Sequence, residues 1–383
     1  YFYINIFSNK SEEKVMDAQI IQDFNNLYFS KKQISRRIFD KEELENIWKI
    51  IEDDRMKISF ESNFNFKPFV NYWFNNTEDI ISNTEFINEA NNLGVFNYIS
   101  SKIREKIYNS AEEAELLGLA NLENIVISDE ILKNLKLAIS NGCNIDEEFI
   151  CNLYSIVDGE GIKDNKNAIE GIVRNESNAG NIKTLISLIN EDEGKNALIV
   201  AATIYLYIIV NKPFRRYNSI ISELLSYKYL LINGYEVIKY CSLSTLINSK
   251  LKKYKAAIEN SIYSNGDITY FIRFYISALR EAVEALNNEL NYKFGKRILK
   301  ELIERNNVRL EERHIKFINS ILSSKDNVVT IDNYKNKLDI SYETARSDLN
   351  YLVTLGFFKI AKSGKRYEYY KNDISTIVDN FEE

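Results

Sequence analysis

Residues 196–211, NALIVAATIYLYIIVN, and residues 212–223, KPFRRYNSIISE, decide the fold of this chain. The first segment is apolar on nearly every side, which indicates a helix buried on all faces. It is shorter than the ~20 residues that a membrane-spanning helix needs, so we expect a core helix and no membrane partner. The second segment holds Pro213, one of only two prolines, and a new helical pattern starts at Ser219. The sequence therefore predicts two core helices joined by a short loop, a place where many helical enzymes carry catalytic residues.

The composition favours a folded and mainly α protein. The 383 residues are enough for two or three domains at ~150 residues per domain. Hydrophobic residues make up 45% and charged residues 27%, which is ordinary for globular proteins. Two prolines and 13 glycines leave few helix breakers. The formal net charge of −6 argues against nucleic-acid binding by the whole chain, so any such partner must dock on one basic patch.

The cysteines indicate a reducing compartment. Cys143, Cys151 and Cys241 are odd in number and form no C-x-x-C pair, as expected for reduced, buried thiols. The first residues, YFYINIFSNKSEEKVMDA, lack the basic start and long apolar core of a signal peptide. We therefore expect a cytoplasmic location.

Helical patterns follow one another through most of the chain. They cover residues 102–122, 129–140, 146–157, 181–190, 197–210, 219–232, 244–261 and 266–286. An aromatic-rich stretch before them, residues 58–74, has the pattern of a short hairpin. This succession predicts one helical bundle.

A smaller unit follows a charged helical connector over residues 291–309. Within residues 310–383 the expected order is helix 311–322, helix 331–338, a turn, helix 341–355, and two strands over 357–362 and 367–371. This is the order of a winged helix-turn-helix. Its DNA-contacting candidates are Ser341, Tyr342, Thr344 and Arg346 on the recognition helix and Lys362, Lys365 and Arg366 on the wing. The alternative is a dimerisation or protein-docking unit.

Two segments resemble the Fic (Fido-fold) family. Its members carry an apolar helix followed by a loop of the form His-x-Phe-x-(Asp/Glu)-Gly-Asn-Gly-Arg-x-x-Arg, and residues 196–237 resemble both parts in order. Residues 266–272, GDITYFI, are similar to a later element of the family. The resemblance covers roughly residues 40–370. It implies a Fido helical core over 101–290, preceded by an N-terminal helical and aromatic region over 1–100, with the winged helix as a common fusion.

The resemblance also implies that the catalytic loop is degenerate. Lys212 stands where the family uses histidine as general base, and a lysine with a pKa near ~10.4 is protonated at neutral pH. Arg216 replaces the acidic residue that holds Mg²⁺. Ile220 and Glu223 replace the two arginines that grip phosphates. We therefore expect no cofactor, neither ATP nor Mg²⁺.

Only two residues of the loop keep the family pattern. Phe214 matches the packing phenylalanine, and Asn218 matches the asparagine, for which we expect a helix-capping role in place of a ligand contact. Tyr217 and Ser219 stand where the family has glycines that let backbone amides approach phosphates. Four departures at base, metal and phosphate positions, and two more at these glycines, favour a pseudoenzyme over an altered mechanism.

Two neighbouring features of the family are also altered. After Gly171–Arg174 only NESNAGN, residues 175–181, remains where relatives carry a flap over the target chain, so the flap is expected to be deleted. Glu113 stands in the place of an inhibitory glutamate, whose expected partner Glu223 is itself acidic. The simpler interpretation of Glu113 is a solvated acidic helix face.

The residues and motifs that most enzyme mechanisms require do not occur in this sequence. The only histidine is His314, near the C-terminal unit, and no zinc, Walker or dinucleotide motif occurs. We expect a catalytically degenerate Fic-like regulator that binds DNA or a protein. The alternatives are a transferase with a remodelled pocket, in which Lys212 must be buried and neutral, or a nucleotide or anion sensor. The sensor would use Lys212, Arg215, Arg216 and Asn218. A homo-oligomer formed through the helical core also stays open.

Overall fold

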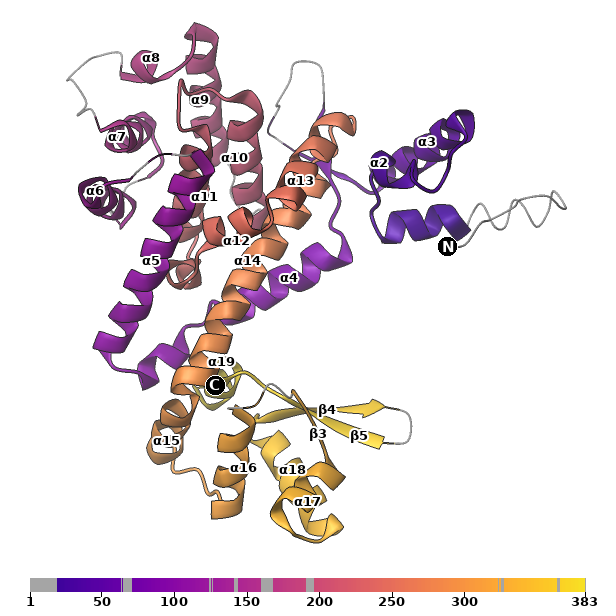
Figure 1. Ribbon diagram of the computed structural model, residues 1–383, viewed down its shortest axis with the longest axis vertical. Helices are drawn as coiled ribbons and strands as arrows, with labels where there is room; N and C mark the ends of the chain where they lie inside the picture. The colour runs from indigo at the N-terminus through magenta and orange to yellow at the C-terminus, as the bar shows by residue number, and fades with distance from the viewer. Residues whose placement is uncertain are drawn as a thin grey trace, which may run out of the picture.

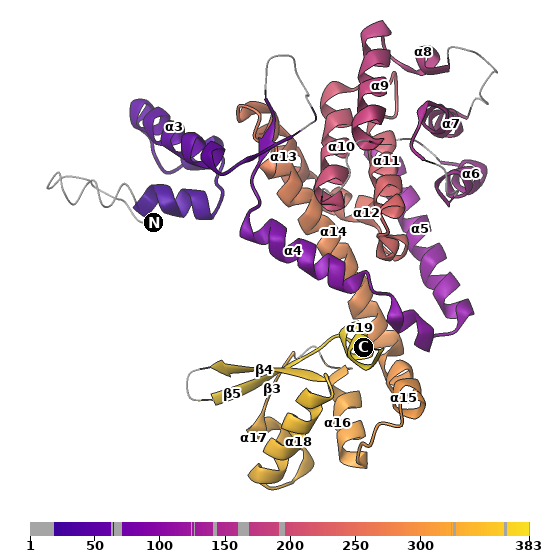
Figure 2. The same cartoon turned by 180° about the vertical axis from the view of Figure 1, so that it is seen from behind.

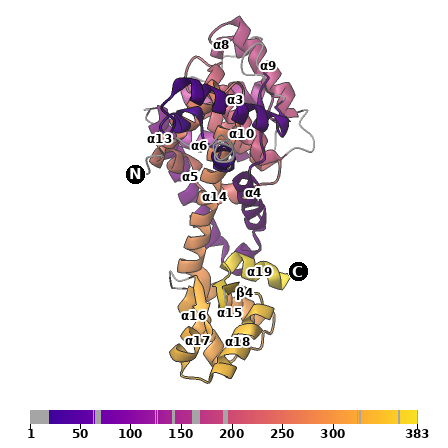
Figure 3. The same ribbon diagram turned by 90° about the vertical axis from the view of Figure 1, so that its right-hand side faces the viewer.

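The computed structural model has a helical bundle at one end and a smaller C-terminal unit at the other (Figures 1 and 3). The structure describes residues 19–62, 64, 71–123, 125, 127–140, 144–159, 168–190, 196–322, 324, 327–363 and 366–382. Among these residues, no helix combines the length and the apolar character that crossing a membrane requires.

Two adjacent helices form the centre of the bundle. They are α10 (Ala197–Asn211) and α11 (Asn218–Ile232), as the opening stretch predicts. Every residue of α10 from Ala197 to Ile208 is buried, which explains why this helix has no polar face. Around them pack α5 (Ser101–Glu123), α12 (Leu243–Ser249), α13 (Leu251–Tyr263) and α14 (Thr269–Glu289).

Smaller helices complete the bundle. They are α4 (Glu78–Ala90), η1 (Gly94–Tyr98), α6 (Asp129–Ser140), α7 (Glu147–Asp158), α8 (Ala168–Ile172), α9 (Glu176–Asn190) and η2 (Glu236–Tyr240). The mainly α class and most predicted helices are confirmed. Three predicted helices had wrong bounds. α9 starts five residues earlier than expected, α14 starts and ends three residues later, and the helix predicted over 244–261 is divided at Lys250. Lys250 has ψ of 28°, outside helical geometry, so α12 and α13 change direction there.

An N-terminal unit projects from the bundle (Figure 2). It contains a helical segment over 19–26, α2 (Lys31–Ile34) and α3 (Lys41–Lys57). A small core of its own holds it together, formed by Phe24, Ile34, Ile47, Trp48 and Ile51. The predicted hairpin is present as the antiparallel strands β1 (Phe60–Glu61) and β2 (Trp73–Phe74).

The GDIT element joins this unit to the bundle. Trp73 N–H donates to Gly266 O at 2.9 Å, and Ile268 N–H donates to Trp73 O at 2.9 Å. The hydroxyl of Tyr28 donates to the Asp267 carboxylate at 2.9 Å. Asp267 also accepts from the N–H of Thr269 at 3.0 Å. Residues 266–269 therefore have a structural role as a joint between two units.

A continuous helical path leads from the bundle to the C-terminal unit. α14 passes through the π-helical turn η3 (Leu290–Phe294) into α15 (Gly295–Arg305). The C-terminal unit then contains α16 (Glu312–Leu322), β3 (Val328–Thr330), α17 (Ile331–Leu338), α18 (Tyr342–Thr354), β4 (Phe358–Ser363), β5 (Arg366–Lys371) and α19 (Ile374–Glu382). The strands form one antiparallel sheet in the order β3-β5-β4. The three helices and the two-stranded hairpin were predicted, whereas β3 and α19 were missed.

Candidate functional site

The loop between α10 and α11 is held by two residues in left-handed conformation. Lys212 ends α10 with φ of 45°, and Tyr217 precedes α11 with φ of 63°. Such geometry costs a non-glycine residue roughly 1–2 kcal/mol, so the surrounding contacts must compensate for it. Between them Phe214 is completely buried, and its ring lies 6.1 Å from that of Tyr154.

Asn218 closes the loop and does not cap the helix. Tyr217 is the residue that precedes the helix, so the expected capping role of Asn218 was wrong. The buried Asn218 side chain accepts a hydrogen bond from Phe214 N–H at 3.1 Å and donates one to Phe214 O at 3.0 Å. Both ends of its amide are thus used to fix the backbone of Phe214.

The segment expected to precede a deleted flap packs directly on this loop. Val173 and Phe214 form an antiparallel bridge. Arg215 N–H donates to Ile172 O at 3.0 Å, and Arg174 N–H donates to Pro213 O at 3.1 Å. Immediately after this bridge α9 begins, so NESNAGN belongs largely to a helix.

The start of α11 is already occupied by a carboxylate. Glu123, at the end of α5, accepts a hydrogen bond from Ser219 N–H at 2.7 Å. Backbone N–H groups at a helix N-terminus attract anions, and here an acidic side chain of the same chain takes that place.

The two arginines of the loop bind different partners, and its lysine is exposed. Arg216 pairs with Asp158 at 2.6 Å, and the Arg215 guanidinium donates to Val173 O at 2.8 Å. Lys212 is exposed. The alternative of a transferase with a remodelled pocket needs a buried Lys212, and the exposed position does not meet that condition.

The glutamates of α5 lie in different environments. Glu113 is exposed, in line with the simpler interpretation of a solvated face. Three acidic residues of α5 reach the neighbourhood of α11. Glu112 and Glu115 line a cavity together with Glu223, and Glu123 accepts from Ser219 N–H. Ile220 is fully buried in the core.

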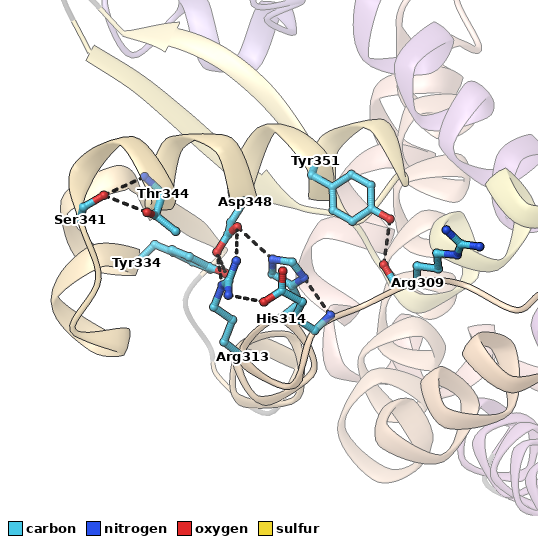
Figure 4. A network of polar contacts seen from close by, with 9 residues as sticks. Arg309, Arg313, His314, Tyr334, Ser341, Thr344, Asp348 and Tyr351 are labelled. Atoms are coloured by element: carbon cyan, nitrogen blue, oxygen red, sulfur yellow. Dashed lines mark hydrogen bonds and ion pairs between the residues drawn. The ribbon is translucent and has the colours of Figure 1, made fainter.

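The C-terminal unit is organised around Asp348 of α18. Arg313 donates two hydrogen bonds to this carboxylate, at 2.8 and 3.1 Å, and the Tyr334 hydroxyl donates a third at 3.2 Å. The imidazole Nε2 of His314 lies 3.1 Å from Asp348 Oδ1 (Figure 4). Burial acts to raise the pKa of Asp348, but its contacts with Arg313 and His314 outweigh burial and hold the pKa below its ordinary value. His314 is therefore a buried structural residue.

This network fixes α18 with one face exposed. Tyr342 and Arg346 lie on the exposed face, while Leu349 and Leu352 are completely buried. Ser341 caps the helix, since its hydroxyl accepts from Thr344 N–H at 3.1 Å and lies 2.8 Å from the Thr344 hydroxyl. The two hydroxyls proposed for DNA contact therefore bond to each other.

The hairpin β4–β5 lies beside α18. The Tyr369 hydroxyl donates to Asn350 Oδ1 at 3.0 Å and ties β5 to the helix. Lys362 and Arg366 are exposed near the hairpin end, where Ser363 pairs with Arg366. Lys365 lies outside the described residues. The hairpin thus carries exposed cationic side chains near its end.

Three residues of these sites were missed by sequence reasoning. Asp348 had a signal, because it interrupts the apolar face of its helix between Ala345 and Leu349. Glu123 and Asp267 had none, since Glu123 accepts from Ser219 N–H and Asp267 from the Tyr28 hydroxyl, both far away in the chain. Among the described residues, no group of three or more His, Cys, Asp or Glu side chains is placed to hold a metal ion.

Comparisons with known proteins find likeness among solved structures. No protein-family model matches the chain, and no curated protein matches it. A Fic family protein from Desulfovibrio desulfuricans G20 aligns with a TM-score of 0.44 and 14% identity, over 77% of this chain and 96% of that one. The structure of IbpAFic2 covalently tethered to Cdc42 aligns with a TM-score of 0.34 and 16% identity, over 73% of this chain and 100% of that one.

Proposed function

We propose that the protein is a DNA-binding regulator whose C-terminal unit is a winged helix and whose Fic-like core is catalytically inactive. The observation that carries the proposal is the exposed face of α18 beside the cationic hairpin β4–β5. A helix of this kind can enter a major groove while cations on an adjacent hairpin contact phosphates. The Asp348 network supports the same function, because base recognition needs a helix held in one orientation.

The contacts of the α10–α11 loop support the inactive core. Glu123 occupies the N–H group of Ser219, and Asn218 is committed to the backbone of Phe214. A nucleotide phosphate would meet the Glu123 carboxylate there, and Mg²⁺ would meet Arg216 in place of an acidic ligand. These residues do not fit either group, and they equally disfavour a nucleotide sensor in this loop.

DNA binding is tested by fluorescence anisotropy of the full chain with a labelled duplex of randomised sequence. We expect saturable binding at 50 mM salt that weakens steeply toward 200 mM, with a log–log slope of about −0.9 per phosphate contact. Lys362→Ala should remove one phosphate contact and so make that slope shallower by about 0.9. Duplexes enriched over rounds of selection would then supply a specific site.

Arg346→Ala on the selected site tests the recognition helix. We expect a loss of about tenfold or more, the range of a base contact worth roughly 1–3 kcal/mol. Arg36→Ala is the matched control, because Arg36 is equally exposed on the distant N-terminal unit. No binding at 50 mM salt, or equal loss in both variants, would exclude DNA recognition by α18.

Loss of transferase chemistry has its own test. The chain is incubated with labelled nucleoside triphosphates, Mg²⁺ or Mn²⁺, and a cell lysate, and we expect no label on any protein. Label that appears with the wild type and disappears with Lys212→Ala would show that the loop is active, whatever the DNA experiment gives.

A further inference from the structure

Two buried glutamates and the half-buried Glu112 line one cavity inside the bundle. Glu115 comes from α5 and is 6% exposed, and Glu223 comes from α11 and is 1% exposed. Both line a cavity of about 40 Å³ and a smaller one of about 10 Å³. A single water needs roughly 10–15 Å³ measured in this way, so the larger cavity has room for more than one water-sized group.

Each carboxylate has an oxygen without a hydrogen-bond partner. Glu115 Oε2 accepts from Ser244 N–H at 3.0 Å, but Glu115 Oε1 has no partner among the described residues, and neither has Glu223 Oε2. No ion pair to either residue occurs in the part of the chain that the structure describes. An unsatisfied buried acceptor costs roughly 1–3 kcal/mol, and more when it is charged. The two oxygens therefore have room for a further hydrogen-bond donor.

The walls of the cavity restrict what that donor can be. Tyr108, Tyr227 and Cys241 line the larger cavity, and Tyr275 lines the smaller one. Tyrosine rings favour cations over their faces. The one basic residue in the lining, Lys239, is paired with Glu236. The exposed residue Ser140 also lines the larger cavity, which gives a route from solvent.

A divalent metal does not suit this arrangement. Such ions take six or more oxygen ligands, or four nitrogen and sulfur ligands, and no group of three acidic, histidine or cysteine side chains in the described residues is placed for this. A primary ammonium group has three N–H donors and one positive charge, which match two carboxylates with unused oxygens.

We propose that the cavity between α5 and α11 binds the ammonium head of a small primary amine, held by Glu115 and Glu223. The carboxylates form charge-assisted hydrogen bonds to the ammonium, and the tyrosine rings surround its alkyl part. Burial raises the pKa of Glu223 and the neighbouring Glu115 raises it further, so repulsion between the two carboxylates opposes their joint ionisation when no cation is bound. A bound cation removes this repulsion and favours both ionised carboxylates.

Isothermal titration calorimetry of the full chain tests the site. The probes are methylammonium, 1,4-diaminobutane and, as a cation without N–H donors, tetramethylammonium, all at constant ionic strength. We expect one saturable site for at least one primary amine and none for tetramethylammonium. Equal binding of potassium or tetramethylammonium would overturn the ammonium assignment.

Three isosteric variants locate the binding. Glu115→Gln and Glu223→Gln should each weaken amine binding tenfold or more, because each loses a charge that faces the ligand. Glu113→Gln is the matched control, since Glu113 lies on the same helix but is exposed. The melting temperature of the wild type should rise with the amine and not with tetramethylammonium, which tests the site even where a variant fails to fold. No saturable heat and no thermal shift with any primary amine, or equal binding by Glu223→Gln, would refute the proposal.

Discussion

At the scale of single residues, the GDIT joint shows how one glycine can hold two units together. Gly266 has φ of +88°, and a Cβ at this position would lie 2.3 Å from the carbonyl oxygen of Asn71. Only glycine is suitable here. Other residues avoid a positive φ of this size, and their Cβ would collide with a backbone carbonyl, which cannot turn away as a flexible side chain can. The close approach of residues 71–73 explains why this element requires glycine at its first position.

Gly266→Ala should therefore destabilise the protein by roughly 3 kcal/mol, combining left-handed strain with overpacking. The free energy of unfolding in urea measures the effect. Gly180→Ala is the control, because a Cβ there meets no atom within 4 Å and alanine stabilises a helix by about 0.5–1 kcal/mol. A similar free energy for both variants would show that residues 71–73 move aside without cost.

Asp267, in the same joint, predicts a pH dependence of stability. Burial raises the pKa of Asp267 to about 6, although the hydrogen bond with Thr269 and nearby Arg55 oppose the shift. The unfolded carboxyl titrates near ~3.9, so between these values the native state binds more protons than the unfolded state. Stability should fall as the pH rises from about 4 to 6, by up to ~3 kcal/mol, and stay level above that window.

The measurement compares the wild type with Asp267→Asn at several pH values between 4 and 8. Asparagine keeps the shape and cannot ionise, so its unfolding free energy should fall less over the same range. Glu115 and Glu223 also have raised pKa values and contribute a slope of the same sign to both proteins. Parallel curves would mean that Asp267 is not the group that titrates.

At the scale of elements, helix positions follow from the sequence, whereas their polar contacts do not. The apolar run of α10 and the heptad-like spacing of α18 are local patterns, so both helices were predicted with ends within two residues. Asn218 was assigned to a cap because asparagine favours caps, but its side chain bonds to the backbone of Phe214, four residues earlier. Glu113 was chosen by motif spacing, while burial on α5 follows the stripe that contains Glu115, Leu116, Leu119 and Ala120.

The element with the clearest test is α18. Asp348→Ala removes the acceptor of Arg313 and Tyr334 and leaves Arg313 paired with Glu311 alone. The half-exposed Arg313 can regain water, so we expect a cost of about 2 kcal/mol, below that of a fully buried pair. Hydrogen exchange of α18 amides should become about 30-fold faster. Asp332→Ala is the control, because Asp332 is exposed on α17, and equal protection in both variants would show that apolar contacts alone fix α18.

At the scale of the whole molecule, the C-terminal unit is fastened to the bundle and not merely linked to it. Asn291, in the π-helical turn, donates to Asp373 Oδ1 at 2.9 Å and accepts from Ile374 N–H at 2.8 Å. α19 also contacts η1 and α15. Arg305 of α15 donates to Asn97 O at 3.1 Å, next to the ring of Tyr98. This attachment could not be predicted, because it depends on a helix after the hairpin whose partners lie about 80 to 280 residues earlier in the sequence.

Asn291→Ala should loosen this attachment while the bundle stays folded. Two buried hydrogen bonds are lost, each worth about 0.5–1.5 kcal/mol, so α19 amides should exchange roughly 10- to 100-fold faster. Small-angle scattering should show a broader distribution of distances, because the C-terminal unit then moves relative to the bundle. Asn288→Ala is the matched control, since Asn288 is exposed one turn earlier on the same helical path. If α19 keeps its protection in Asn291→Ala, apolar packing against η1 and α15 holds the two units together without the asparagine.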